Sequence, residues 1–143
     1  MKDLHNIINA MRVVSPVAIG TTGTGQTGKI MDMSGYGGVE FIVAYGTVTA
    51  TNAVFTVVCK EGDVTGTLTS VADADLLGTE LLAGLAATTP RTSGVSKLVT
   101  KRLGYKGNKR YVNLSISSTI TAATPISISA IMHTPIVSAT SNP

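Results

Sequence analysis

A glycine-rich segment, Gly23-Thr24-Gly25-Gln26-Thr27-Gly28-Lys29, has the spacing of two phosphate-binding motifs. It satisfies the dinucleotide fingerprint G-x-G-x-x-G and nearly satisfies a P-loop, whose lysine contacts phosphates. Both motifs need a preceding strand and a following helix, because the N-terminus of that helix holds the phosphate. Residues 30–38 contain three glycines and no helical stripe, and Ile30 stands where a P-loop has Ser or Thr. The segment is therefore predicted to be a turn between two strands.

Other residue types that support catalysis or metal binding are scattered along the chain. His5 and His133 lie near opposite ends of it, whereas a zinc site needs three or four ligands. Cys59, the single cysteine, falls in an apolar alternating run and is expected to be a buried small hydrophobe. Asp73 and Asp75 lack the further oxygen ligands of a calcium loop and are expected to cap or turn the chain. There is no G-x-S-x-G nucleophile elbow. We therefore predict no catalytic residue, metal site or cofactor, and a protein that is not an enzyme.

The basic residues are concentrated in one stretch with no acidic residue. Six of the eleven lysines and arginines fall there: Lys97, Lys101, Arg102, Lys106, Lys109 and Arg110. The stretch is compatible with the solvated rim of a hairpin that turns at Lys106-Gly107-Asn108-Lys109. It is also compatible with contact to an acidic protein surface or to phosphates. A net charge of +3 is too small to argue for nucleic acid by itself.

The composition indicates a single domain that contacts other subunits. The length of 143 residues suits one domain. Charged residues make up 13%, whereas about a quarter is usual. The longest weakly polar stretch, Leu76–Ala87, is shorter than the ~20 apolar residues of a membrane span. The low charge is therefore interpreted as a sign of subunit contacts. A single cysteine and the lack of a signal pattern favour assembly in a reducing cytoplasm.

Short runs with period-two alternation, separated by Gly, Thr, Ser and Asn, predict an all-β fold. The expected strands are Arg12–Ile19, Lys29–Met33, Val39–Tyr45, Ala53–Glu61, Val95–Leu103, Arg110–Ser118 and Pro125–Thr134. Inward-facing positions on the last two are expected to be Val112, Leu114, Ile116, Ile126, Ile128, Ala130 and Met132. Outward-facing positions are expected to be Tyr111, Asn113, Ser115 and Ser117. We predict an antiparallel β-sandwich of two packed sheets, jelly-roll-like, with a short N-terminal arm.

The remaining segments are expected to be loops, arms or single helical turns. Asp3–Met11 could form one or two helical turns with an apolar stripe. Asp75–Leu85 is expected to be a loop or a one-turn helix, capped by Asp73 or Asp75. Gly62–Gly94 is expected to cross between the sheets or to project as a contact loop. The chain is thus divided into an arm (1–11), a sandwich domain (12–137) and a tail (138–143).

Parts of the sequence resemble small proteins encoded beside the capsid gene of tailed bacteriophages. The resemblance lies in Gly104–Ile116, in the Thr/Ala-rich turn and strand Ile126–Met132 that follow, and in the loop Ala74-Asp75-Leu76-Leu77-Gly78. The opening, a short arm before a strand and a Gly/Thr loop, is also similar. The resemblance implies a capsid decoration, or cement, protein. Such proteins are non-enzymatic β domains that bind the outside of the head and hold neighbouring capsid subunits together.

On this interpretation the partners are the major capsid protein and further copies of the chain, with no membrane and no nucleic acid. The protein would be made in the host cytoplasm and would lie on the outer capsid surface of the virion. The expected partner-binding residues are Leu4, Ile7, Ile8 and Met11 of the arm and Lys101, Arg102, Lys106 and Lys109 of the basic stretch. The arm is expected to contribute more to affinity, because buried apolar side chains outweigh exposed ion pairs. The alternatives are a head–tail or tail structural component and a β-sandwich module for a host surface or carbohydrate.

Overall fold

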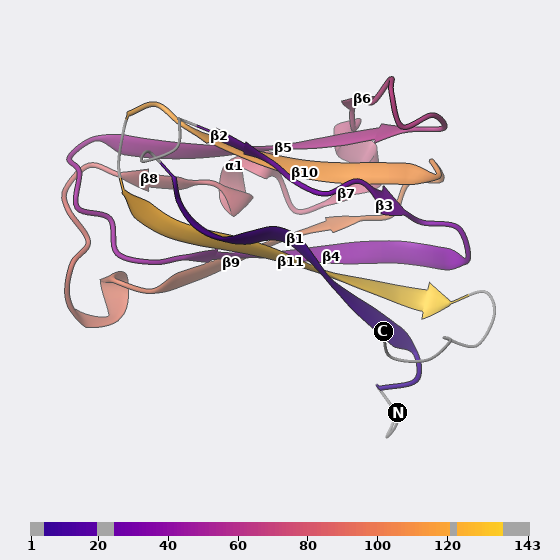
Figure 1. Cartoon of the computed structure of the whole chain (residues 1–143), viewed down its shortest axis with the longest axis horizontal. Helices are drawn as coiled ribbons and strands as arrows, with labels where there is room; N and C mark the ends of the chain where they lie inside the picture. The colour runs from indigo at the N-terminus through magenta and orange to yellow at the C-terminus, as the bar shows by residue number, and fades with distance from the viewer. Residues whose placement is uncertain (1–4, 20–24, 121–122, 136–143) are drawn as a thin grey trace.

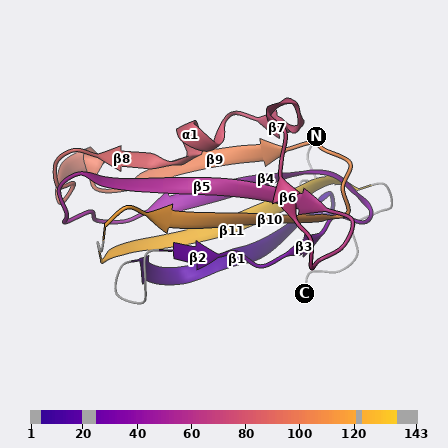
Figure 2. The same ribbon diagram turned by 90° about the horizontal axis from the view of Figure 1, so that it is seen from above.

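The protein is a sandwich of two antiparallel sheets, as the computed structural model shows for residues 5–19, 25–120 and 123–135 (Figures 1 and 2). The first sheet contains, in order, β1 (Ile8–Ile19), β11 (Thr124–Pro135), β4 (Tyr36–Tyr45), β9 (Val99–Tyr105) and β7 (Leu76–Leu77). The second contains β2 (Gly25–Thr27), β10 (Tyr111–Ser118), β5 (Ala53–Gly62) and β6 (Thr69–Ser70). In addition, β3 (Met31–Asp32) pairs with β10 and β8 (Leu85–Ala87) pairs with β5.

The strand pairs are nested along the chain. β1 pairs with β11, β2 and β3 with β10, β4 with β9, and β5 with β6 and β8. Successive nested pairs alternate between the two sheets, which is the pattern of a long two-stranded ribbon wound around a common core. This is the strand order of a jelly roll. The predicted fold class, an antiparallel jelly-roll-like sandwich, is confirmed.

The core lies between the sheets and is built from alternate residues of the long strands. The predicted inward positions of β10 and β11 are all buried. β4 and β5 add Phe41, Val43, Phe55 and Val57, which are also buried. Asn113 differs from the prediction of an outward, polar position, since it is 3% exposed. Its side-chain amide donates a hydrogen bond to the carbonyl of Gly28, so the segment after β2 covers it.

Two local predictions near the chain ends and turns are corrected. β1 begins at Ile8, so Ile8–Met11 are strand rather than helix, because they pair with β11 and Met11 packs against the core. Residues 1–4 and 138–143 lie outside the described residues, and the division into arm, domain and tail stays a prediction. A hairpin turn at Lys106–Lys109, one of the alternatives for the basic stretch, is wrong, because β9 and β10 belong to different sheets. That turn is a connection between the two layers.

The long segment between β5 and β9 crosses between the sheets, as predicted. β6 and β8 pair with β5, whereas β7 pairs with β9 in the other sheet. The helices of the described residues are short: η1 (Asp73–Asp75), α1 (Glu80–Ala83) and η2 (Gly94–Ser96). None of them is long and apolar enough to cross a membrane. The N-terminal cap of α1 is Thr79, whose hydroxyl accepts from the Leu82 amide at 3.1 Å, and not Asp73 or Asp75.

Candidate functional site: a groove at the edge of β9

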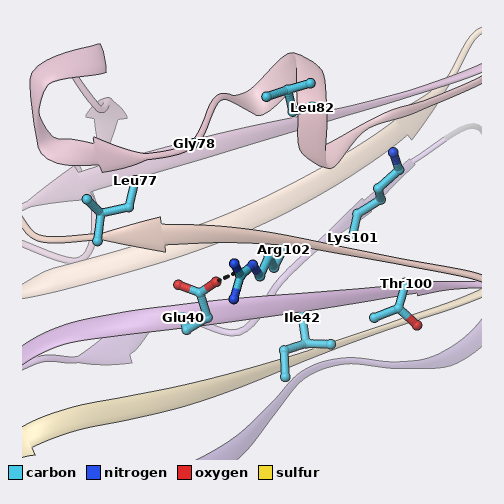
Figure 3. A pocket seen from close by; sticks show the side chains of 8 residues that line it. All are labelled: Glu40, Ile42, Leu77, Gly78, Leu82, Thr100, Lys101 and Arg102. Atoms are coloured by element: carbon cyan, nitrogen blue, oxygen red, sulfur yellow. Dashed lines mark ion pairs between the residues drawn. The ribbon is translucent and has the colours of Figure 1, made fainter.

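A groove of about 780 Å³ lies beside β9 (Figure 3). Strand β4, strand β9, strand β7 and helix α1 all contribute to it. The lining residues are Glu40, Ile42, Leu77, Gly78, Leu82, Thr100, Lys101 and Arg102. Two of them, Lys101 and Arg102, are among the residues that the sequence predicted to bind a partner. The groove is therefore the place where the predicted basic residues meet exposed apolar side chains.

The groove exists because β9 lacks a full neighbour on one side. β4 pairs with β9 over its whole length, from Val99 to Tyr105. On the other side β7 pairs only with Gly104 and Tyr105. Within the described chain, Val99–Leu103 therefore has no strand neighbour on this side, although α1 packs close to β9 there. The close approach of β7 requires a glycine, because a Cβ at Gly104 would lie 2.8 Å from the Cβ of Leu77.

Helix α1 forms one wall of the groove and is tethered to both sheets. The carboxylate of Glu80 accepts a hydrogen bond of 2.5 Å from the backbone amide of Cys59 in β5. The carbonyl of Ala83 accepts one of 2.9 Å from the hydroxyl of Tyr45 in β4. These bonds hold the single turn in place although it is too short to be stable alone. Its two leucines remain outside, with Leu81 88% and Leu82 64% exposed.

The charges of the groove are mainly positive. The Nε of Arg102 lies 3.7 Å from Glu40, and the Arg102 side chain is 83% exposed, so this pair is weak. Lys101 has no ion pair among the described residues. Figure 3 shows its side chain on the α1 side of β9, pointing away from Glu40. The groove thus combines apolar walls, from Leu77, Leu82 and Ile42, with two cationic groups and one partly neutralised carboxylate.

Lys106 and Lys109 lie away from this groove. They line a second hollow of about 540 Å³ at the connection between the sheets. Lys109 donates to Asp63 at 2.6 Å, and this hydrogen bond lowers the pKa of the Asp63 carboxyl. Arg110 binds Asp32 through two nitrogens, the shorter distance being 2.9 Å, and lowers the pKa of that carboxyl. The structure therefore divides the basic stretch into two places and pairs part of it with acids.

The predicted arm residues are not brought together with the basic residues. Ile7 and Ile8 are half-buried, Met11 packs against the core, and Leu4 lies outside the described residues. β1 is at one edge of its sheet, whereas β9 and β7 are at the other. The sequence prediction missed Leu77 and Leu82 as surface residues. The paired leucines at 76–77 and 81–82, in a segment without alternation, are the signal that could have indicated them.

The residues with catalytic potential have structural explanations. Burial raises the pKa of the Cys59 thiol to about 12, which disfavours the nucleophilic thiolate. The prediction that the glycine-rich segment is a turn is wrong for Gly25–Thr27, because these residues form β2 and pair with β10. Lys29 is followed by strand β3 and not by the helix that a phosphate-binding motif needs. A Cβ at Gly28 would lie 2.1 Å from the carbonyl oxygen of Leu114, so this glycine permits the close packing of two backbones. Among the described residues, no group of three His, Cys, Asp or Glu could hold a metal ion.

Comparison with known proteins finds structures of similar fold but no matching sequence family. No protein-family model and no curated protein matches the chain. The SPBc2 prophage-derived protein YomS is similar in structure, with a TM-score of 0.52 and 9% identity, over 89% of this chain and 93% of that one. The PBSX exported protein XepA has a TM-score of 0.51 and 12% identity, over 94% of this chain and 40% of its own. The VP2 subviral particle of infectious bursal disease virus has a TM-score of 0.50 and 10% identity, over 93% of this chain and 34% of its own. At these identities the shared property is the sandwich architecture.

Proposed function

We propose that the protein is a structural component of a tailed-phage virion, which binds the outer surface of the head and stabilises contacts between major capsid protein subunits. The observation that carries this proposal is the groove beside β9. It presents leucines and cationic groups on the sandwich, and among the described residues no group of three His, Cys, Asp or Glu could hold a metal ion there. Such a surface is suited to holding another protein and not to transforming a small molecule.

The distribution of apolar side chains supports a role in subunit contacts. Several large hydrophobic residues are at least half exposed: Val64, Leu77, Leu81, Leu82, Val95 and Leu98. Soluble monomers seldom expose large contiguous apolar patches. Leu77 and Leu82 both line the groove, whereas Leu81, on the same helical turn as Leu82, does not. A partner that occupied the groove would remove Leu77 and Leu82 from water.

The fold is compatible with this role. The similar structures include a prophage-derived protein, the PBSX exported protein XepA and a viral VP2 particle. Jelly rolls are frequent among viral capsid and lectin domains, so the architecture alone does not decide the function. The decision therefore rests on the surface and on a binding experiment.

The alternative of a carbohydrate-binding module receives no support from the aromatic residues. Sugar rings commonly stack on exposed aromatic side chains. The chain has four tyrosines, two phenylalanines and no tryptophan. Phe41, Phe55, Tyr45 and Tyr105 are buried, and the other two tyrosines are half-buried. None of these rings offers an open platform for a sugar.

The direct test is co-sedimentation of the purified full chain with intact heads of the phage that encodes it. We expect the chain to pellet with tailless heads, to saturate, and to remain in the supernatant when heads are omitted. Isolated tails of the same phage serve as the second arm. Binding to tails and not to heads would favour the head–tail or tail alternative, and binding to neither would exclude both virion roles.

A further inference from the structure

We propose that the groove beside β9 takes an extended, acidic segment of the partner protein, which adds to the sheet as a strand alongside Val99–Leu103. This inference rests on the proposed function for the identity of the partner, the major capsid protein. It specifies which part of the surface makes the contact and what chemistry the partner must present.

The first argument is the open edge of β9. Over Val99–Leu103 the backbone groups that point away from β4 have no ladder partner among the described residues. Five residues of strand offer about 17 Å of edge, at ~3.4 Å per residue. Natural proteins blunt such edges with proline, bulges, charged side chains or a covering helix, and β9 has Lys101 and the short α1 but no proline or bulge. β1, at the opposite edge of the sheet, has Pro16 and two register shifts, whereas the pairing of β9 with β4 is regular.

The second argument is the shape beside that edge. An added strand alternates its side chains, so every second one would face the groove. There it would meet Leu77 on β7 and Leu82 on α1, which are 50% and 64% exposed. Ile42 and Thr100 extend the lining onto the outer face of the sheet. A volume of about 780 Å³ can hold several side chains of an extended segment.

The third argument is charge, which selects the occupant. Lys101 is unpaired by any acid among the described residues, and Glu40 is already next to Arg102. A second copy of this chain laid edge to edge would bring Lys101 and Arg102 close to their own counterparts. Like charges in such a position are unfavourable. An acidic segment would instead pair with both cations, so the groove fits an acidic partner better than a second copy.

The test compares groove variants with matched neighbours in the head co-sedimentation assay. Leu82→Ser and Lys101→Glu alter the groove. Leu81→Ser, one residue away on α1, and Lys97→Glu, with the same change in net charge, alter residues outside its lining. We expect each groove variant to bind at least tenfold more weakly and each control to bind within about twofold of wild type. All four sites have solvent-accessible side chains, so we expect all four variants to fold. Urea midpoints close to that of wild type will confirm this.

The outcomes separate this inference from the proposed function. If wild type binds heads and the groove variants bind equally well, the inference is wrong and the proposed function stands. If wild type does not bind heads, the proposed function is wrong, and a peptide titration decides the inference. The probe is a blocked eight-residue peptide of alternating Val and Glu, compared with its Val/Lys counterpart. The measurement is the shift of backbone amide NMR signals on addition of peptide. Strand addition would be supported if only the acidic peptide shifts the signals of residues 99–103 and if Leu82→Ser abolishes these shifts. Their absence would refute it.

Discussion

Replacing Gly28 with alanine is expected to destabilise the sandwich strongly. A Cβ at this position would lie 2.1 Å from the carbonyl oxygen of Leu114 and 2.5 Å from a methyl carbon of Val13. Ordinary contacts are about 3.5–4.0 Å, so the backbone after β2 would have to move away from β10 by more than ~1 Å. That movement would also break the hydrogen bond from the buried Asn113 amide to the Gly28 carbonyl.

The expected loss combines two costs. Overpacking of a tight contact costs about 1–3 kcal/mol. Leaving a buried amide without its acceptor costs a further ~1–3 kcal/mol. The sum of about 2–6 kcal/mol is a large part of a typical stability of about 5–15 kcal/mol. With an m-value of about 2 kcal/mol per M, the urea midpoint should fall by about 1–3 M.

The assay is equilibrium urea unfolding of wild type, Gly28→Ala and the control Gly66→Ala. A Cβ at Gly66 would meet no heavy atom within 4 Å. The control should therefore be neutral or gain ~0.4–1 kcal/mol from a stiffer unfolded chain. A Gly28→Ala midpoint equal to that of the control would refute the packing explanation of this glycine.

Four further outcomes are expected. Leu114→Ala should lower the free energy of unfolding by about 2–5 kcal/mol, because the side chain is fully buried. Ser115→Ala should lower it by at most ~0.5–1.5 kcal/mol, for the loss of one hydrogen bond. Similar losses at both sites would contradict the observed register. Burial raises the pKa of Cys59 from 9.0 to about 12, so the folded state keeps a proton that the unfolded state loses. Stability should therefore be complete below pH ~9 and fall as the pH rises towards 12, less steeply in Cys59→Ala when urea midpoints are compared across that range. ATP and NAD should leave the melting temperature unchanged, because Gly25–Thr27 is strand β2 and no helix follows Lys29, whereas a ligand at a hundred times its Kd would add ~2.7 kcal/mol. Deleting residues 1–11 should weaken head binding and also lower the urea midpoint, because four of these residues belong to β1; an unchanged midpoint would show that this part of β1 is dispensable.

The alternation of apolar residues predicted the long strands but not the short ones, and the predicted strand Val95–Leu103 begins only at Val99, because Gly94–Ser96 forms a helical turn. Phe41 and Val43 in β4, like Leu114 and Ile116 in β10, are buried and lie two residues apart, which is the period of a strand with one buried face. Burial of that face selects the register. The order of the strands within the sheets could not be predicted from this alternation, because the nested pairs join residues that are far apart in sequence. Nothing local in Ile8–Ile19 indicates that its partner is β11.

The turn after β9 illustrates why a local signal can mislead. Lys106-Gly107-Asn108-Lys109 has the residue types of a hairpin turn. In the structure the hydroxyl of Tyr105 donates to Glu61 on the other sheet at 2.5 Å and accepts from the Lys109 amide at 3.1 Å. These bonds direct the chain across to the second layer. They depend on Glu61, whose proximity follows only from the tertiary fold.

The candidate site was predictable in part. The cationic residues Lys101 and Arg102 could be selected from charge density alone. Leu77 and Leu82 could not be separated from core leucines such as Leu76 and Leu85, because the segment between β5 and β9 has no regular period. Only the pairing of β7 with β9, and the tethering of α1 by Glu80, decide which leucines face water.

The nested pairing also governs the order in which the molecule can be completed on the ribosome. β11 lies between β1 and β4, and β10 lies between β2 and β5, so the strands made late occupy the middle of both sheets. Until they emerge, β1, β2 and β3 lack their ladder partners and the core lacks seven buried hydrophobic residues, and long-range pairing of this kind slows folding. A chain truncated before β10 would expose unpaired strands of both layers and be prone to aggregate or to be degraded. The complete sandwich is therefore expected to form only after translation has reached the end of β11.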